Sequence, residues 1–325
     1  MISPRHIRKV DFNERYYICR FTEGYSTNFS ITVKYNQYIS RNLLSNALRA
    51  FILKNNWLLH NFFKTSDEES SKTNGNDWIL KIINTVQFDD VVKYTKIDKF
   101  NEKVMERVNS YTLTMNENLP LWRIIIFEES NGDQVVCVYV DHSHFDGLSG
   151  VQFQKDLAKE FSLASDDKFI SELFNYGKDG YSLPDIEPAA ESITDLYYPS
   201  YLQIVNSYLS SIPIHSKLSS LFNPSVDPPV FQTTKPVNHV LSTKFKFLKY
   251  TPEQVEEITK FCRSNGITLT SYFDVLFIQA LEETVFKEIG NGPYSTASLV
   301  AINGRRYYSE DIRNFRYGSM LIDLP

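Results

Sequence analysis

The chain has 325 residues, of which 42% are hydrophobic and 14% aromatic, so it can bury a large core and form two lobes. Its 34 basic and 39 acidic residues are spread along the sequence and give a net charge of −5, which argues against a nucleic-acid-binding protein. No apolar run approaches the roughly 20 residues that cross a bilayer, and the N-terminus lacks the hydrophobic region of a signal peptide.

The first half of the chain predicts short strands and helices. Residues 40–59 have apolar side chains at helical spacing behind a serine N-cap. Residues 121–140 contain two apolar runs around Ser-Asn-Gly-Asp, which predicts a β-hairpin. Gly147 interrupts the pattern after the hairpin, before the helical spacing of 151–161. The other elements expected here are strands at 28–36 and 78–83 and a helix at 101–113.

The second half opens with a weakly patterned, proline-rich stretch at 166–238, which predicts a crossover connection between lobes. The best-signalled helix follows it, because Thr251 suits the N-cap, Pro252 suits the first helical position and Gly266 ends the helix. The other elements expected here are helices at 201–212 and 268–289 and strands at 239–248 and 294–308. The whole pattern predicts an α/β or α+β fold with mixed strands.

A polar cluster follows the hairpin at residues 141–147, Asp-His-Ser-His-Phe-Asp-Gly. Such a cluster at the end of a buried strand can converge on a ligand while the strand holds it rigidly. The histidines could also be structural residues in a turn. Alternatively, His142, His144 and Asp146 have the H-x-H-x-D spacing of the metallo-β-lactamase family, which would make the protein a zinc hydrolase. That family has another histidine where this chain has Gly147.

A third interpretation rests on a family resemblance. Residues His142 to Gly147 match the H-x-x-x-D-G motif of the CoA-dependent acyltransferase superfamily, and within it the chain most resembles the fungal alcohol O-acetyltransferases. Residues 14–36 are similar to that family's opening strand region. The sequences Ala-Ile-Asn-Gly-Arg-Arg at 301–306 and Phe-Arg-Tyr-Gly-Ser-Met-Leu at 315–321 look like its N-x-R strand end and Y-G segment.

The resemblance covers essentially the whole chain and implies a fold class. We expect an α/β (α+β), two-lobed CoA-dependent acyltransferase-like fold with mixed sheets. The N-terminal lobe would span 1–165 and carry the motif, and 166–238 would connect it to a partial C-terminal lobe at 239–325. Members of the superfamily run well past this length, so we expect the second lobe to be incomplete and the chain to be truncated.

The resemblance also implies the chemistry and the residues that carry it. His142 would be the general base that deprotonates an alcohol, and direct transfer from acetyl-CoA would need no acyl-enzyme. A histidine pKa near ~6.5 suits this task. Asp146 completes the motif, either in a triad with His142 or, as in the family, in a structural ion pair with Arg305. Gly147 would let the backbone pass close to the tunnel or serve as a plain turn glycine. His144 would be structural or line the substrate.

The expected partners are acetyl-CoA as co-substrate and a small or medium-chain alcohol, with no permanently bound cofactor and no metal. Two alternatives stay open: N-acetyl transfer to a long-chain amine, and an inactive truncated paralogue that serves as a binding chain. We expect an intracellular, cytoplasmic monomer. Peripheral contact with the endoplasmic reticulum, other membranes or lipid droplets stays compatible with the sequence.

Overall fold

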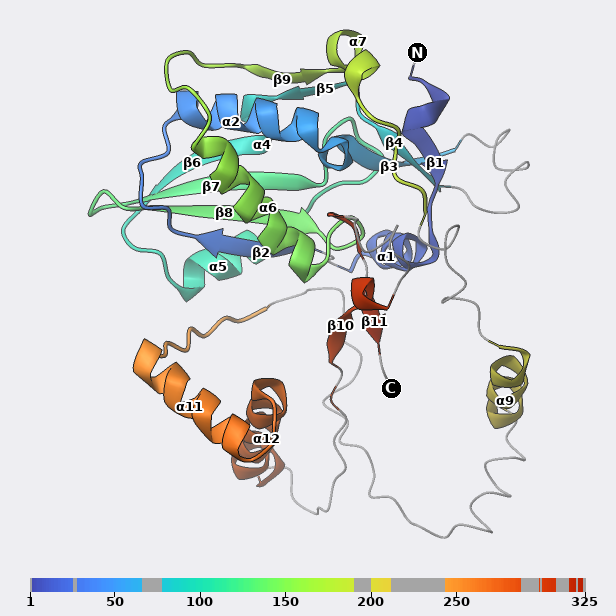
Figure 1. Cartoon of the computed structure of the whole chain (residues 1–325), viewed down its shortest axis with the longest axis vertical. Helices are drawn as coiled ribbons and strands as arrows, with labels where there is room; N and C mark the ends of the chain where they lie inside the picture. Colours follow the sequence, from blue (N-terminus) through green and yellow to red (C-terminus); the bar gives the residue numbers. More distant parts are fainter. Residues whose placement is uncertain are drawn as a thin grey trace. The chain divides into compact units, whose positions relative to one another are not determined.

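The computed structural model describes residues 2–25, 28–65, 78–189, 200–211, 243–287, 298, 300–307, 316–319 and 321–323 (Figure 1). The chain divides into two compact units. The first comprises Met1–Tyr197, His239–Phe245 and Asn303–Ile322, and the second comprises Tyr198–Asn238, Lys246–Ile302 and Asp323–Pro325. The first unit thus includes residues that the sequence assigned to the crossover connection, while the lobe limits themselves stay predictions.

The centre of the first unit is a four-stranded sheet with the order β2-β8-β7-β6. Its strands are β2 (Asn28–Val33), β6 (Val92–Ile97), β7 (Trp122–Glu129) and β8 (Gln134–Asp141). Strands β7 and β8 form the predicted hairpin, β2 pairs antiparallel with β8, and β6 runs parallel to β7. A mixed sheet of this kind was predicted, and the fold class is confirmed.

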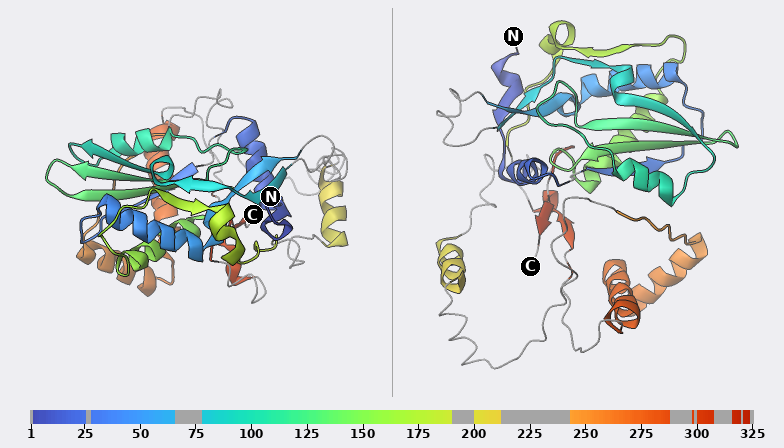
Figure 2. Two further views of the ribbon diagram at one scale, coloured as in Figure 1. Left: turned by 90° about the horizontal axis from the view of Figure 1, so that it is seen from above. Right: turned by 180° about the vertical axis from the view of Figure 1, so that it is seen from behind.

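Both faces of this sheet are covered, which explains the continuous apolar runs of the hairpin (Figure 2). Helices α2 (Arg41–Lys54) and α6 (Gly147–Phe161) pack on one face, and α5 (Glu102–Asn109) packs on the other. Alternate residues of β7 and β8 point to opposite sides: Ile124, Ile126, Val136 and Val138 belong to the main core, and Ile125, Phe127, Val135 and Cys137 belong to the cluster with α5.

Smaller elements complete the first unit. One sheet has the order β1-β4-β3, with β1 (Ile7–Lys9), β3 (His60–Lys64) and β4 (Trp78–Ile82), and β5 (Thr85–Gln87) pairs with β9 (Glu172–Asn175). Short helices are α4 (Phe88–Val91) and α7 (Tyr176–Asp179), with 3-10 turns at Pro4–His6, Asn56–Leu59, Gly180–Ser182 and Gly304–Arg306. The short strands β10 (Ala301–Asn303) and β11 (Leu321–Asp323) form a separate two-stranded sheet, and each of them has residues in both units.

The opening region corrects one prediction. Within the segment at 14–36 that was expected as a strand region, only β2 is a strand, and the residues before it form helix α1 (Phe12–Thr22). A reciprocal capping box starts this helix: the Asp11 carboxylate accepts from the Glu14 amide at 2.8 Å, and the Glu14 carboxylate accepts from the Asp11 amide at 2.7 Å. These bonds satisfy backbone N–H groups that the first turn of a helix leaves without a partner inside the helix.

The second unit contains helices α9 (Tyr201–Ser211), α11 (Pro252–Ser264) and α12 (Leu269–Leu281), the last followed by a short π-helix at Glu282–Phe286. Thr251 caps α11, and Gly266 has a φ of +65° after it, so the predicted start and end are confirmed. The strand expected at 239–248 is wrong over 243–248, where Lys and Phe alternate without a strand assignment. Residues 239–242 lie outside the described residues.

Within the part of the chain that the structure describes, none of the helices combines the length and hydropathy that a membrane crossing requires. The histidines at 215 and 239 and the proline-rich segment at 222–230 lie outside the described residues.

Candidate active site

The polar cluster lies in the turn between β8 and α6, and Asp141 organises that turn. Its carboxylate accepts hydrogen bonds from the backbone amide of Ser143 at 2.9 Å and from the Ser143 hydroxyl. Its carbonyl accepts from the amides of His144 and Phe145 at 3.1 and 3.0 Å. Because these bonds fix the chain immediately on both sides of His142, the direction in which His142 leaves the turn is set by the backbone.

His142 is half-buried against two aromatic rings. The Tyr17 ring lies nearly parallel to the imidazole, with 4.9 Å between centroids and 8° between planes, and the Phe29 ring lies 4.9 Å away at 54°. Burial lowers the pKa of His142 below its ordinary 6.5, against the opposing effects of nearby backbone groups and of Asp141 and Asp146. The imidazole is therefore neutral at pH 7 and can accept a proton.

Asp146 is bound to Arg305, as the resemblance implied. The guanidinium Nη1 of Arg305 lies 2.5 Å from Oδ2 of Asp146, and the two side chains are only 6% and 2% exposed. Asp146 is also the N-cap of α6, since its Oδ1 accepts from the amide and hydroxyl of Ser149 at 2.7 and 2.8 Å. Through its contacts with Arg305 and Ser149, the Asp146 carboxylate is part of a structural network.

The Tyr-Gly segment near residue 318 completes this network. The Gly318 carbonyl accepts from the Asp146 amide at 3.2 Å and from Arg305 Nη2 at 3.2 Å. It also lies 2.9 Å from the Ser149 hydroxyl, whose single proton is shared between this carbonyl and the Asp146 carboxylate. About two turns further along the same helix face, Asp156 accepts from the Tyr317 hydroxyl at 2.6 Å and from Arg316. Sequence reasoning did not identify Ser149 or Asp156, although both lie at helical spacing after the motif.

His144 turns into the core. It is completely buried and stacks on Trp57 with 4.2 Å between ring centroids. Its Nε2 lies 2.7 Å from the backbone carbonyl of Trp57, and its own backbone carbonyl accepts from the Trp57 indole at 3.0 Å. Burial lowers the pKa of His144 to about 4. His142 instead contacts Tyr17 and Phe29, so the H-x-H-x-D residues do not converge on one point. Among the described residues, no three His, Cys, Asp or Glu side chains are grouped to hold a metal ion.

The two glycines of the motif region differ in their surroundings. A Cβ on Gly147, the exposed first residue of α6, would meet nothing within 4 Å, so local packing does not require glycine there. A Cβ on Gly150 would lie 3.0 Å from Cε2 of Phe29 and 3.0 Å from Cγ1 of Ile31. Gly150 thus gives Phe29 the space in which it packs beside His142.

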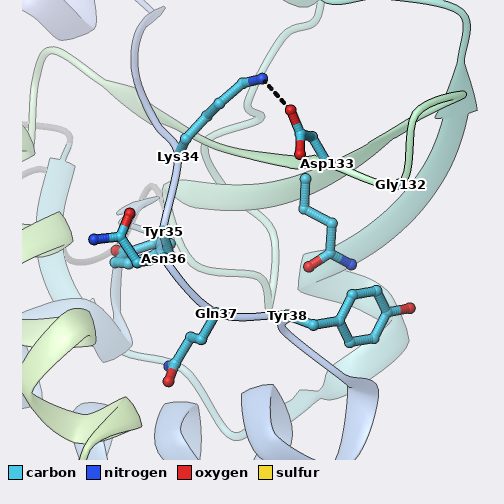
Figure 3. A pocket seen from close by; sticks show the side chains of 8 residues that line it. Lys34, Tyr35, Asn36, Gln37, Tyr38, Gly132 and Asp133 are labelled. Atoms are coloured by element: carbon cyan, nitrogen blue, oxygen red, sulfur yellow. Dashed lines mark hydrogen bonds and ion pairs between the residues drawn. The ribbon is translucent and has the colours of Figure 1, made fainter.

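A pocket of about 410 Å³ lies near the opposite end of β8 (Figure 3). It is lined by Lys34, Tyr35, Asn36, Gln37, Tyr38, Gly132, Asp133 and Gln134. The Lys34 ammonium group pairs with the Asp133 carboxylate at 3.2 Å across it. Gln134, the first residue of β8, lines the pocket, whereas His142 follows Asp141, the last residue of β8. An extended strand of eight residues is about 26 Å long. It is therefore separate from the histidine turn.

Comparisons with known proteins identify the family of this chain. The family model for alcohol acetyltransferase matches residues 10–322, which is nearly the whole chain. The chain belongs to the alcohol acetyltransferase family. The predicted relationship to the fungal alcohol O-acetyltransferases is confirmed, and with it the assignment to an acyltransferase family.

Curated relatives from Saccharomyces cerevisiae share part of the sequence. Alcohol O-acetyltransferase 2 is 23% identical over 98% of this chain and 68% of its own length, and alcohol O-acetyltransferase 1 is 26% identical over 68% of this chain and 48% of its own length. The N-acetyltransferase SLI1 is 23% identical over 86% of this chain and 61% of its own length. The chain thus spans about half to two thirds of these relatives.

A solved structure of similar fold is the first condensation domain of the calcium-dependent antibiotic synthetase, in complex with a substrate analogue. Its TM-score is 0.57 at 14% identity, over 98% of this chain and 69% of the condensation domain. At this identity the likeness concerns the fold alone. It agrees with the predicted CoA-dependent acyltransferase fold.

Proposed function

We propose that this protein transfers an acetyl group from acetyl-CoA to the hydroxyl group of an alcohol, with His142 as the general base. The observation that carries the proposal is the half-buried His142 imidazole, packed against Tyr17 and Phe29, in the H-x-x-x-D-G turn of a chain that belongs to the alcohol acetyltransferase family. An alcohol is a poor nucleophile at neutral pH, so ester formation needs a group that removes its proton as attack begins.

In the proposed reaction, His142 takes the hydroxyl proton while the alcohol oxygen attacks the acetyl carbonyl. The tetrahedral intermediate then collapses as the carbon–sulfur bond breaks, and the CoA thiolate leaves and receives the proton from the imidazolium. No acyl-enzyme forms in this direct transfer. Asp146 supports the reaction through its ion pair with Arg305, which fixes the start of α6 behind the histidine turn.

Two alternatives are kept. Similarity to the N-acetyltransferase SLI1 favours an amine acceptor as the second candidate, in which the same base would remove a proton from the attacking nitrogen. A binding chain without activity, which the sequence leaves open, is the third candidate. Five other expectations stay predictions. They are the acceptor's chain length, the lack of a permanently bound cofactor, the monomeric state, the cytoplasmic location and any contact with membranes or lipid droplets.

The test is an acceptor panel. The purified full chain is mixed with acetyl-CoA and short- to medium-chain alcohols or long-chain amines, and release of free thiol and the acetylated product are followed together. Ester formation that disappears in His142→Gln supports the proposal, and amide formation would favour the second candidate. Acetyl-CoA binding without product from any acceptor would favour the binding chain. Tyr181→Leu, at a side chain that is 95% exposed, serves as a matched control.

A further inference from the structure

The contacts of His142 raise the question of what holds its ring in place. In many sites with a histidine base, a carboxylate accepts a hydrogen bond from Nδ1 and so fixes the ring. Here Asp146 pairs with Arg305, and among the described residues Nδ1 of His142 is buried without a hydrogen-bond partner. Within the part of the chain that the structure describes, no carboxylate thus orients the imidazole through Nδ1, and the contacts that cover its ring are the aromatic ones with Tyr17 and Phe29.

The two rings that pack on His142 come from well-anchored elements. Tyr17 lies on α1, which is held by its capping box and by a bidentate ion pair between Arg8 and Glu14 at 2.7 and 2.8 Å. Phe29 lies on β2 and pairs in register with Val140 of β8, two residues before His142. Tyr17 is therefore positioned by a helix outside the histidine turn, and Phe29 is positioned by the strand that pairs with β8 immediately before it.

A third residue sets the space for this arrangement. Gly150 faces Phe29 from α6, and a methyl group there would press on the Phe29 ring at 3.0 Å. That distance is closer than a methyl group and an aromatic carbon pack without strain. The Phe29 ring would have to move away from Gly150. Because the same ring also packs on the His142 imidazole, Gly150 affects His142 through Phe29.

We infer that Tyr17 and Phe29, with Gly150 behind Phe29, are positioning residues that hold the His142 imidazole in one orientation and keep water from it. This inference rests on the proposed function for its catalytic consequence, but its physical content concerns His142 alone. A ring that loses one of these contacts becomes both more mobile and better hydrated. Better hydration favours the charged imidazolium, so at a given pH a smaller fraction of His142 is neutral and able to accept a proton.

The decisive variants are Tyr17→Leu, which removes the stacked ring, and Tyr17→Phe, which keeps it. The His142 ring is titrated by NMR in the full chain, with its resonance assigned by its loss in His142→Gln, and kcat and KM are measured with the best acceptor. We expect Tyr17→Leu to move the His142 pKa up toward 6.5 and to lower kcat about threefold to tenfold with little change in KM. Tyr17→Phe should keep both values near the wild type.

Phe29→Leu and Gly150→Ala are expected to act in the same direction, and Tyr181→Leu is expected to change nothing. If Tyr17→Leu does not fold, as judged by circular dichroism, Phe29→Leu decides the question. An unchanged His142 titration in the folded leucine variants would overturn the inference. A wild-type chain that forms no product with any acceptor would overturn the proposed function instead, because the titration still reports on the aromatic contacts without activity.

Discussion

Arg305 and Asp146 form a buried ion pair although 159 positions separate them in the chain. The guanidinium lies against the N-terminus of α6, and the same carboxylate caps that helix through Ser149. The pair therefore joins the segment after β10 to the turn that holds His142. An ion pair with side chains 6% and 2% exposed cannot be broken on one side without leaving a charge that water does not reach.

Asp146→Asn removes the charge of the ion pair but keeps a good N-cap residue at the start of α6, so it tests the ion pair alone. We expect the free energy of unfolding to fall by about 3 to 5 kcal/mol, since the Arg305 guanidinium would be buried without its counter-charge. Urea denaturation measures this change. Transfer activity should fall as well, because the start of α6 fixes the turn behind His142.

The control for this variant is Asp185→Asn. Asp185 lies 3.5 Å from Arg5, but the two side chains are 72% and 37% exposed, so its removal should cost less than about 1 kcal/mol. Equal small losses in both variants would contradict the structural role of the buried pair.

The sequence alone predicted the features that local chemistry determines. The hairpin of β7 and β8 follows from two apolar runs around a turn, and α11 follows from Thr251, Pro252 and Gly266. The contact of Asp146 with Arg305 was implied only by the family resemblance, because no local pattern links residues so far apart.

Two features of the site could not be predicted in this way. The stacking of Tyr17 on His142 is a tertiary contact between α1 and the turn after β8, and the sequence around residue 17 contains no sign of it. The helix α1 itself had a readable signal, since Asp11 and Glu14 have the spacing of a capping box. The partner contacts of Ser149 and Asp156 likewise depend on where the Tyr-Gly segment docks.

His142→Ala and His144→Ala should separate catalysis from stability. Loss of a general base should lower kcat about 10²-fold to 10⁴-fold, with little loss of stability because His142 is only half-buried. His144→Ala should instead leave a cavity beside Trp57 and cost about 2 to 4 kcal/mol of stability, while the folded fraction keeps a substantial part of its activity. Steady-state kinetics and urea denaturation on the same preparations test both. Equal losses of kcat would indicate that the two histidines act together.

Stability should depend on pH through the buried histidines. His60 and His144 are completely buried, and burial lowers the pKa of His60 well below 6.5 and that of His144 to about 4. Both are therefore neutral in the folded state, so their stabilising effect is complete above pH 6.5 and is lost as the pH falls toward 4. For His144 the decrease in the free energy of unfolding should approach about 3 kcal/mol. Urea denaturation between pH 7.5 and 4.5 tests this, and His144→Phe, which cannot titrate, should flatten the slope.

The rate of transfer should follow the protonation of His142. A base works only in its neutral form, so kcat/KM should fall as the pH drops through the pKa of the imidazole. Because burial against Tyr17 and Phe29 lowers that pKa below 6.5, activity should persist at pH values where an exposed histidine is already half protonated. A profile of kcat/KM between pH 5 and 8, with thiol release as the readout, gives the acid limb directly. The limb should lie below pH 6.5 in the wild type and in Tyr181→Leu. A limb at or above 6.5 would mean that the titrating group is hydrated, and that the environment of His142 during transfer differs from the one described.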